Sequence, residues 1–275
     1  VLVDRATVVG LGRGLGDRGL FHPDRMEAAV ETLGAYVQET ARHGIRPWSI
    51  RAVATSAARR AMNAATFFQR VQRDLGLKVR IISGDEEARL TWAGAVRDLE
   101  LPDGPMLVID LGGGSTELVC GTRAATTTRV SVEVGSVRLT EAFLGTDLVE
   151  PAALARARQH VDERVRGINL TPTPRTVVGV AGTVTTLRAM LAGLPEYDPD
   201  AVHGGRITRS ELAGLIDTLL PANPQERRAL CPSSPERADY LLAGALILDR
   251  VLGAARRPSL IVSDRGLRFG LLAEG

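Results

Sequence analysis

Lysine is almost absent from this chain. Of the 34 basic residues in the 275-residue sequence, only Lys78 is a lysine and the others are arginines. A mechanism that needs a well-placed lysine elsewhere is therefore excluded. The planar guanidinium of arginine suits bidentate phosphate recognition. An arginine-rich, alanine-rich chain is also expected from genome composition, which is the interpretation that we favour.

Aromatic residues are scarce as well, at 4% of the chain, and leave little material for platforms on which nucleobases stack. The net charge of +2 says almost nothing about partners. No apolar run is long enough to cross a bilayer, and no signal peptide opens the chain. We expect no DNA partner and no membrane partner.

Cysteine and histidine are few and scattered. Cys120 and Cys231 lie far apart in a chain too long to need disulfide stapling, which fits a reduced, cytoplasmic protein. The histidines form no H-E-x-x-H motif and no pairing with cysteine, so a zinc site is not expected. They are His22, His43, His160 and His203.

The chain length favours two domains. The opening "VLVDRATVVG" has a strand pattern, and a helix with an apolar stripe follows, formed by Met26, Ala29, Val30, Leu33 and Val37. Strands are predicted at residues 49–55 and 78–83, with helices at 63–75 and from residue 85. This alternation predicts an α/β fold with a mainly parallel sheet.

The pattern changes at Pro105. The stretches "PMLVID", "TELVCG" and "TRVSVEV" predict three short strands in antiparallel hairpins. Helices are predicted at 136–144 and 151–168, a strand in "RTVVGVAGT", mostly helix at 208–252, and a last strand in "SLIVS". We place the domain boundary at residues 92/93. The first domain is residues 1–92 and the second 93–275, with the last helix a candidate to pack back on the first.

Two glycine-rich stretches deserve separate interpretations. "GLGDRG" at residues 14–19 matches the dinucleotide fingerprint G-x-G-x-x-G, but no helix follows at once and no strand-end acid lies at the expected distance. We interpret it as a surface turn. "DLGGGST" has neither the lysine nor the following helix of a Walker A loop, and a strand follows instead, so its glycines form the tip of a β-hairpin.

Three consecutive glycines let the backbone approach a ligand, and successive N–H groups can form an anion-binding nest. An ordinary hairpin turn is the alternative, although one or two glycines would be enough for it. Asp110 and Glu117 flank the glycines and would repel a polyphosphate unless a metal stood between them. We therefore interpret both as Mg²⁺ anchors, acting partly through water.

Two other stretches leave alternatives open. "VGVAGTVTTL" has the order strand, turn and helix, so the N–H groups of Gly182 and Thr183 would point to an anion, or the stretch is simply a tight turn. In "SGDEEARL" the acids either complement the helix dipole or include a base that activates water. The pattern does not choose between Glu86 and Glu87.

Together, "ATSAARRAMNA", "IISGDEEARL", "VIDLGGGSTEL", "GVAGTVTTL" and "VSDRGLRFGLL", in this order, resemble the exopolyphosphatase and guanosine pentaphosphate phosphohydrolase family. The resemblance implies the acetate/sugar kinase, Hsp70 and actin superfamily, with two ribonuclease H-like domains and an active-site cleft between them. The printed sequence starts after the family's first D-x-G-S-N-type phosphate loop. It also lacks the C-terminal HD-type domain of longer members, so a short form is expected.

The resemblance also implies roles for individual residues. The second glutamate of the family's E-E-A-R motif, its catalytic base, matches Glu87. The acids beside the glycines match Asp110 and Glu117 as magnesium-associated carboxylates. Phosphate-contacting positions match Gly112, Gly113, Gly114, Ser115, Arg59, Gly182 and Thr183. The stretch "SDRGLR" at residues 263–268 is implied to be a domain-closing element.

We therefore expect Mg²⁺-dependent hydrolysis of terminal phosphoanhydride bonds of inorganic polyphosphate, releasing orthophosphate. Conversion of guanosine pentaphosphate to tetraphosphate is a second expected reaction. Loop N–H groups, Arg59 and the metal would stabilise the transferring phosphoryl group, and Glu87 would activate water. The alternatives are a phosphotransferase of the same superfamily and a non-catalytic regulator that binds polyphosphate or an alarmone. The resemblance also suggests a homodimer.

Overall fold

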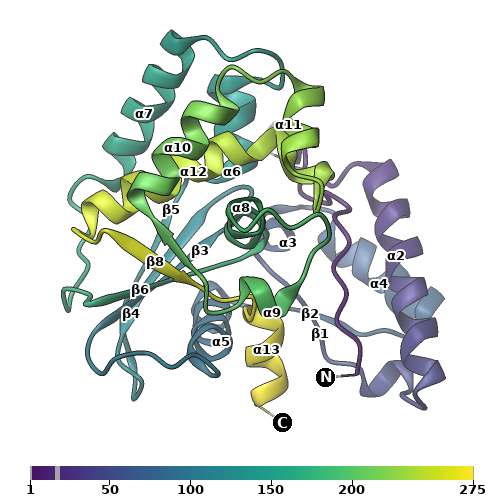
Figure 1. Cartoon of the computed structure of the whole chain (residues 1–275). Helices are drawn as coiled ribbons and strands as arrows, with labels where there is room; N and C mark the ends of the chain where they lie inside the picture. Colours follow the sequence, from purple (N-terminus) through teal and green to yellow (C-terminus); the bar gives the residue numbers. More distant parts are fainter. Residues whose placement is uncertain (1, 16–18, 275) are drawn as a thin grey trace. The chain divides into compact units, whose positions relative to one another are not determined.

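The computed structural model describes residues 2–15 and 19–274. The chain forms two compact units, Val1–Glu87 and Ala88–Gly275, and helix α5 (Gly84–Val96) spans the division (Figure 1). The turn expected at residues 14–19 includes residues 16–18, which lie outside the described residues. Among the described residues, no helix has the length and apolar character needed to cross a membrane.

The first unit is a small α/β unit. Its elements are α2 (Pro23–Arg42), the 3-10 turn η1 (Pro47–Ser49), β1 (Ala52–Ala54), α3 (Ser56–Arg60), α4 (Ala64–Leu75) and β2 (Val79–Ile81). β1 and β2 pair in parallel, as the alternation of strands and helices predicts. The predicted apolar stripe of α2 belongs to the same hydrophobic core as Phe67 and Val71 of α4. Phe21 meets Phe67 edge to face, with ring centroids 5.9 Å apart.

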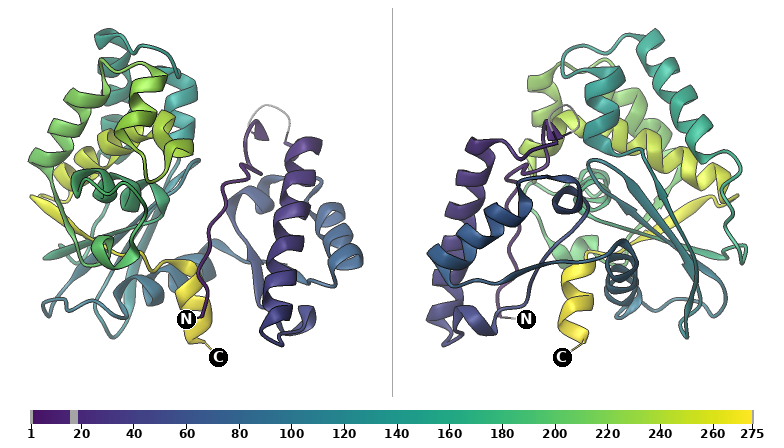
Figure 2. Two further views of the ribbon diagram at one scale, coloured as in Figure 1. Left: turned by 45° about the vertical axis from the view of Figure 1, so that its right-hand side comes forward. Right: turned by 180° about the vertical axis from the view of Figure 1, so that it is seen from behind.

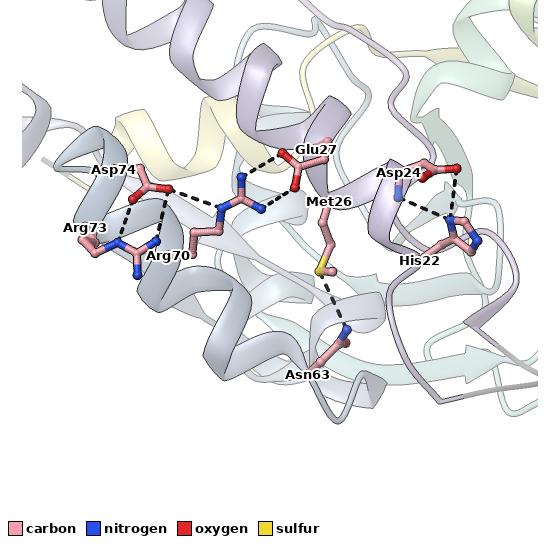
Figure 3. A network of polar contacts seen from close by, with 8 residues as sticks. All are labelled: His22, Asp24, Met26, Glu27, Asn63, Arg70, Arg73 and Asp74. Carbon is pink, nitrogen blue, oxygen red and sulfur yellow. Dashed lines mark hydrogen bonds and ion pairs between the residues drawn. The ribbon is translucent and has the colours of Figure 1, made fainter.

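Polar contacts join α2 and α4 beside this core (Figure 3). Arg70 donates to both carboxylate oxygens of Glu27, at 2.5 and 2.8 Å, and its Nε donates to Asp74 at 3.3 Å. The hydrogen bond from Arg70 holds the pKa of Glu27 below its ordinary value. Because these groups are exposed, the apolar stripe rather than the ion pair supplies most of the packing energy.

The strand expected at the start of the chain does not form: residues 2–10 are not part of any strand. The segment instead contacts α2 (Figure 2): Tyr36 Oη donates to Thr7 Oγ1 at 2.8 Å, and Arg25 Nη1 donates to the Val9 carbonyl at 3.4 Å. A strand needs a neighbour for its N–H and C=O groups. The run of apolar residues made the prediction plausible but could not supply that neighbour.

The second unit contains a six-stranded sheet. Its order is β5 (Thr126–Val132), β4 (Thr116–Gly121), β3 (Met106–Leu111), β6 (Thr176–Val180), β8 (Ser259–Val262) and β7 (Arg206–Thr208). β3, β4 and β5 are antiparallel, which confirms the predicted hairpins. β6 and β8 continue the sheet in parallel, and β7 pairs antiparallel with β8. The sequence pattern missed β7, whose three residues precede a helix and form a strand only by pairing with β8.

Helices cover both faces of this sheet (Figure 1). They are α6 (Ser136–Leu139), the π-helical turn η2 (Thr140–Leu144), α7 (Pro151–Val165), α8 (Gly182–Leu191), α9 (Pro199–Val202), α10 (Arg209–Leu219), α11 (Pro224–Leu230), the 3-10 turn η3 (Pro235–Arg237), α12 (Ala238–Ala254) and α13 (Leu267–Ala273). Leu107 and Ile109 of β3 join the core that contains the buried residues of α12. Met106 and Val108 join the core formed with α5. Alternation along the strand therefore directs Asp110 to the α5 face.

Glycine lets α13 pack closely against α5. A Cβ atom at Gly270 would lie 1.9 Å from the Leu90 carbonyl oxygen, and one at Gly94 would lie 2.1 Å from the Gly266 carbonyl oxygen. Both distances are far below a normal contact, so neither position accepts a side chain without moving the helices apart. The final helix is thereby held against residues of the second unit.

Candidate functional site

Asp110 and Glu117 stand directly opposite each other on the β3–β4 hairpin. Thr91 Oγ1 donates to Asp110 Oδ2 at 3.3 Å. Ser115 Oγ and Ser131 Oγ both donate to Glu117 Oε1, at 2.7 and 3.0 Å. Opposed like charges destabilise a sheet, so a pair of carboxylates held in this position by hydroxyl groups fits a cation.

The pair of acids offers the kind of donor set that the predicted Mg²⁺ would use. Among the described residues, no group of three or more His, Cys, Asp and Glu side chains gathers around one point. Mg²⁺ is typically held by one or two carboxylates together with water and substrate phosphates. Asp110 and Glu117 offer this kind of donor set, so the predicted magnesium anchors remain the residues that would hold the ion.

The glycine-rich tip, residues 112–115, is a tight turn held by neighbouring backbone. The Gly112 N–H donates to the Ser115 carbonyl at 3.0 Å. At the start of α6, the Ser136 N–H donates to the Gly112 carbonyl and the Arg138 N–H donates to the Gly113 carbonyl, each at 3.0 Å. The carbonyl groups of Gly112 and Gly113 are therefore directed toward α6.

Gly135 sits directly against this tip. A Cβ atom at Gly135 would lie 2.4 Å from the carbonyl carbon and oxygen of Gly113 and 2.5 Å from the Gly114 nitrogen. Within the part of the chain that the structure describes, the N–H groups of Gly113 and Gly114 donate no hydrogen bond. A turn with successive N–H groups that are available has the features of an anion-binding nest.

The second predicted loop lies at the same end of the sheet, where the parallel strands β3 and β6 finish. β6 runs parallel to β3 with Val180 opposite Asp110, and α8 begins at Gly182. Between them Ala181 has a φ of 75° and a ψ of 166°, a region that only glycine adopts easily. The hydroxyl groups of Ser136 and Thr183 lie 3.3 Å apart. The structure therefore joins the two predicted loops through α6.

Arg237 is a candidate residue that the sequence did not reveal. Its Nη1 atom lies 1.2 Å from the position that a Cβ atom at Gly182 would take, so the guanidinium occupies the space beside the start of α8. The Nε atom lies 3.6 Å from Glu236 Oε1 and, within the described residues, has no hydrogen-bond partner although it is buried. A cation beside a helix N-terminus favours an anion there.

The first unit contains the other two predicted residues, and the structure brings them together. Arg59 Nη1 donates to Glu87 Oε2 at 2.7 Å and to the Ile82 carbonyl at 2.9 Å. Glu86 instead accepts from Arg80 Nη1 at 2.7 Å, and the Arg80 side chain is 55% exposed. The Glu87 side chain is 14% exposed, compared with 25% for Glu86. The two neighbouring acids thus have separate partners and different surroundings.

The predicted site residues therefore fall into two sets. Arg59 and Glu87 form one contact in the first unit. The second unit holds the carboxylate pair, the glycine tip and the start of α8. In the stretch 263–268, Asp264 accepts a hydrogen bond from Tyr197 Oη, and its N–H donates to His203 Nδ1 at 3.3 Å. Burial raises the pKa of Tyr197. The domain-closing role of this stretch stays a prediction.

The sequence model of the Ppx/GppA phosphatase family matches residues 1–274. Exopolyphosphatase 2 of Mycobacterium tuberculosis is 34% identical over 277 residues, which cover 96% of this chain and 86% of that protein. The solved Ppx/GppA family member of Aquifex aeolicus has a TM-score of 0.83 and 33% identity, covering 99% of this chain and 88% of the other. An exopolyphosphatase of Cytophaga hutchinsonii has a TM-score of 0.88 and 25% identity, with the same coverage.

These comparisons agree with the fold that the structure shows. The solved family members share the α/β fold described above. The hairpin with its opposed acids and the strand-to-helix loop at Gly182 are among the motifs on which the sequence resemblance depended. The chain belongs to the Ppx/GppA phosphatase family.

Proposed function

We propose that this phosphoanhydride hydrolase acts on inorganic polyphosphate and releases orthophosphate from the chain end. The observation that carries the proposal is the opposed pair Asp110 and Glu117 beside a glycine tip whose N–H groups are available. The relatives named as exopolyphosphatases support the choice of substrate.

The second unit supplies the groups that bind the terminal phosphate. N–H groups of Gly113 and Gly114 donate to its oxygens, and Arg237 and the start of α8 add positive potential. These donors oppose the negative charge that develops on the equatorial oxygens in phosphoryl transfer. Mg²⁺, held by Asp110 and Glu117, would neutralise further charge on the phosphate oxygens.

Glu87 is the proposed base. It accepts a proton from the attacking water, whose oxygen forms a bond to the terminal phosphorus while the bond from that phosphorus to the bridging oxygen breaks. The shortened chain leaves with the electron pair of that bond. Arg59 fixes the orientation of the Glu87 carboxylate through the 2.7 Å hydrogen bond and acts through Glu87, as a positioning residue.

The test is release of orthophosphate from polyphosphate, measured with and without Mg²⁺. We expect release that depends on Mg²⁺, and a fall in kcat of at least about a hundredfold in Glu87→Gln, since general base catalysis contributes on that scale. The matched control is Glu86→Gln, which removes the same charge from the adjacent helical position but affects an acid paired with exposed Arg80. We expect Glu86→Gln to keep wild-type rates.

Two results would contradict these assignments. Wild-type kcat in Glu87→Gln would remove Glu87 as the base. Full activity of the double variant Asp110→Asn/Glu117→Gln, with an unchanged Mg²⁺ dependence, would remove the two acids as magnesium anchors.

Guanosine pentaphosphate is the second proposed substrate, because its terminal phosphate presents the same bond to the same groups. Equal kcat/KM values for the two substrates would place recognition in the phosphates alone. If polyphosphate bound tightly with no release of orthophosphate, the protein would act as a regulator. If release required an added acceptor, it would act as a phosphotransferase.

A further inference from the structure

A second basic feature lies in the second unit, apart from the glycine tip. It is a surface groove of about 620 Å³ at one end of the six-stranded sheet. We refer to it as the basic groove; its polar lining consists chiefly of Arg206, Arg209, Arg256, Arg257, Thr208 and Ser210. Four of these six side chains carry a guanidinium group.

The sheet register places the basic groove and the glycine tip at opposite ends of the parallel strands. β7 runs antiparallel to β8 with Thr208 opposite Ser259, and β8 runs parallel to β6. β6 leads from its carboxyl end into Gly182, whereas Ser259 is the first residue of β8. The three residue-to-residue steps along β8 alone separate its two ends by about 10 Å. The groove is therefore a separate feature from the predicted phosphate loops.

The charges around the groove do not cancel. Arg209 Nε donates to Asp249 Oδ1 at 2.8 Å, and the same carboxylate lies 3.7 Å from Arg250 Nη1. Glu211 is occupied by the capping box of α10, where its Oε2 atom accepts from the Thr208 N–H and hydroxyl, each at 2.7 Å. Neither acid neutralises the groove as a whole.

The other three arginines add to this excess of positive charge. Arg206 Nη1 donates to the neutral hydroxyl of Ser259 at 3.0 Å. Arg256 is exposed, with a φ of 53°. The Nε atom of Arg257 is buried and, within the described residues, has no hydrogen-bond partner. Arg256 and Arg257 follow the carboxyl end of α12, where a positive charge complements the helix dipole. Arg206 lies on β7, the edge strand, so the helix dipole does not account for it.

The groove chemistry fits a phosphate polymer without bases. Guanidinium groups bind phosphate oxygens in bidentate pairs. The lining residues include no aromatic side chain on which a nucleobase could stack. We propose that the basic groove binds the distal phosphates of a long polyphosphate chain whose end lies in the catalytic loops. This inference rests on the proposed function.

Binding at two places makes affinity depend on chain length. Once one part of a long chain is bound, the other part is held near its own site at a high effective concentration. Tripolyphosphate has only three phosphates and lacks the distal part of the chain that the groove would bind. The groove should therefore lower the KM for long chains and leave the KM for tripolyphosphate unchanged.

The test variant is Arg206→Gln/Arg256→Asn, which removes two exposed charges. Asn is chosen at residue 256 because it tolerates the left-handed backbone found there. The matched control is Arg156→Gln/Arg158→Gln on α7, which removes two exposed charges from the same unit at another place. Thermal unfolding checks that both variants are folded, and Arg206→Gln alone replaces the double variant if that one is not.

We expect the groove variant to raise the KM for long-chain polyphosphate by about tenfold or more, with kcat and the KM for tripolyphosphate unchanged. The control variant should keep wild-type values for both substrates. An unchanged KM for the long chain overturns the proposal. An equal rise in the control variant also overturns it, because the effect would then come from net charge.

Direct binding separates this proposal from the proposed function. Fluorescence anisotropy of labelled long-chain polyphosphate is measured with the wild type and both variants, whether or not the protein hydrolyses the polymer. Weaker binding in the groove variant alone supports the groove even if no orthophosphate is released. Equal affinity in all three proteins rejects the groove even if hydrolysis is normal.

Discussion

The contact between Gly135 and the glycine tip makes a sharp prediction for Gly135→Ala. The added Cβ atom would lie 2.4 Å from Gly113, whereas an ordinary contact begins at 3.4 Å, so the tip must move by about 1 Å. Gly135 has a φ of −133°, which alanine adopts without strain. The substitution therefore acts through displacement of the tip rather than through the backbone at residue 135.

A displacement of about 1 Å in a group that positions substrate lowers the rate by about a hundredfold. That loss corresponds to about 2.7 kcal/mol of transition-state stabilisation. We expect kcat/KM for polyphosphate to fall by this factor in Gly135→Ala, measured by orthophosphate release. Thermal unfolding of the same preparation should show that the variant remains folded.

Gly214→Ala is the control, because no atom other than the adjoining backbone of its own helix lies within 4 Å of the added Cβ atom. Gly214 is inside α10, where alanine is favoured over glycine by about 1 kcal/mol. We expect a higher Tm and wild-type activity. If Gly135→Ala kept wild-type kcat/KM while folded, the tip would not position the reacting phosphate, and the argument from its geometry would be refuted.

Three further predictions concern stability and reactivity. Arg227 is buried and donates to the carbonyls of Thr146 and Asp147, so Arg227→Met should lower the free energy of unfolding by about 3 kcal/mol in urea; an unchanged midpoint would contradict this. Burial lowers the pKa of His203, so its contribution to stability is complete above about pH 6.5 and is lost as the pH falls through the lower folded-state pKa. His203→Asn should flatten the pH dependence of Tm in that range, and a parallel curve would argue against it. Burial raises the pKa of Cys120 to about 11, so a thiol reagent should label it only as the protein unfolds; rapid labelling of the native protein would disprove the burial.

The local sequence pattern was enough to predict the parts of the site that are built from residues close together in the sequence. The hairpin follows from two apolar strands around three glycines, and Asp110 and Glu117 face each other because pairing in a hairpin is set by the turn. The loop before α8 follows in the same way from a strand, a glycine and a helical pattern. In each case the contacts that decide the structure lie within a few residues.

Contacts between distant residues could not be predicted in this way. Arg237 reaches Gly182 across 55 positions of sequence, and nothing in "SPERAD" marks its guanidinium as part of a loop. The sequence also did not identify Gly135 as the residue that supports the tip. The residue pattern left Glu86 and Glu87 equivalent; the family resemblance implied Glu87, and the structure adds that the two acids have different partners, Arg80 and Arg59. Such assignments depend on tertiary packing, which a local pattern does not contain.

The hydrogen bonds from α6 to the glycine tip also have a kinetic consequence. Ordering a backbone residue costs about 1–2 kcal/mol, and the tip is ordered during folding because Ser136 and Arg138 already hold its carbonyls. An arriving phosphate therefore meets donors that are already in place, which lowers the entropic cost of binding. In a stopped-flow experiment the tip should contribute no slow isomerisation phase, and the observed association rate should rise linearly with ligand concentration.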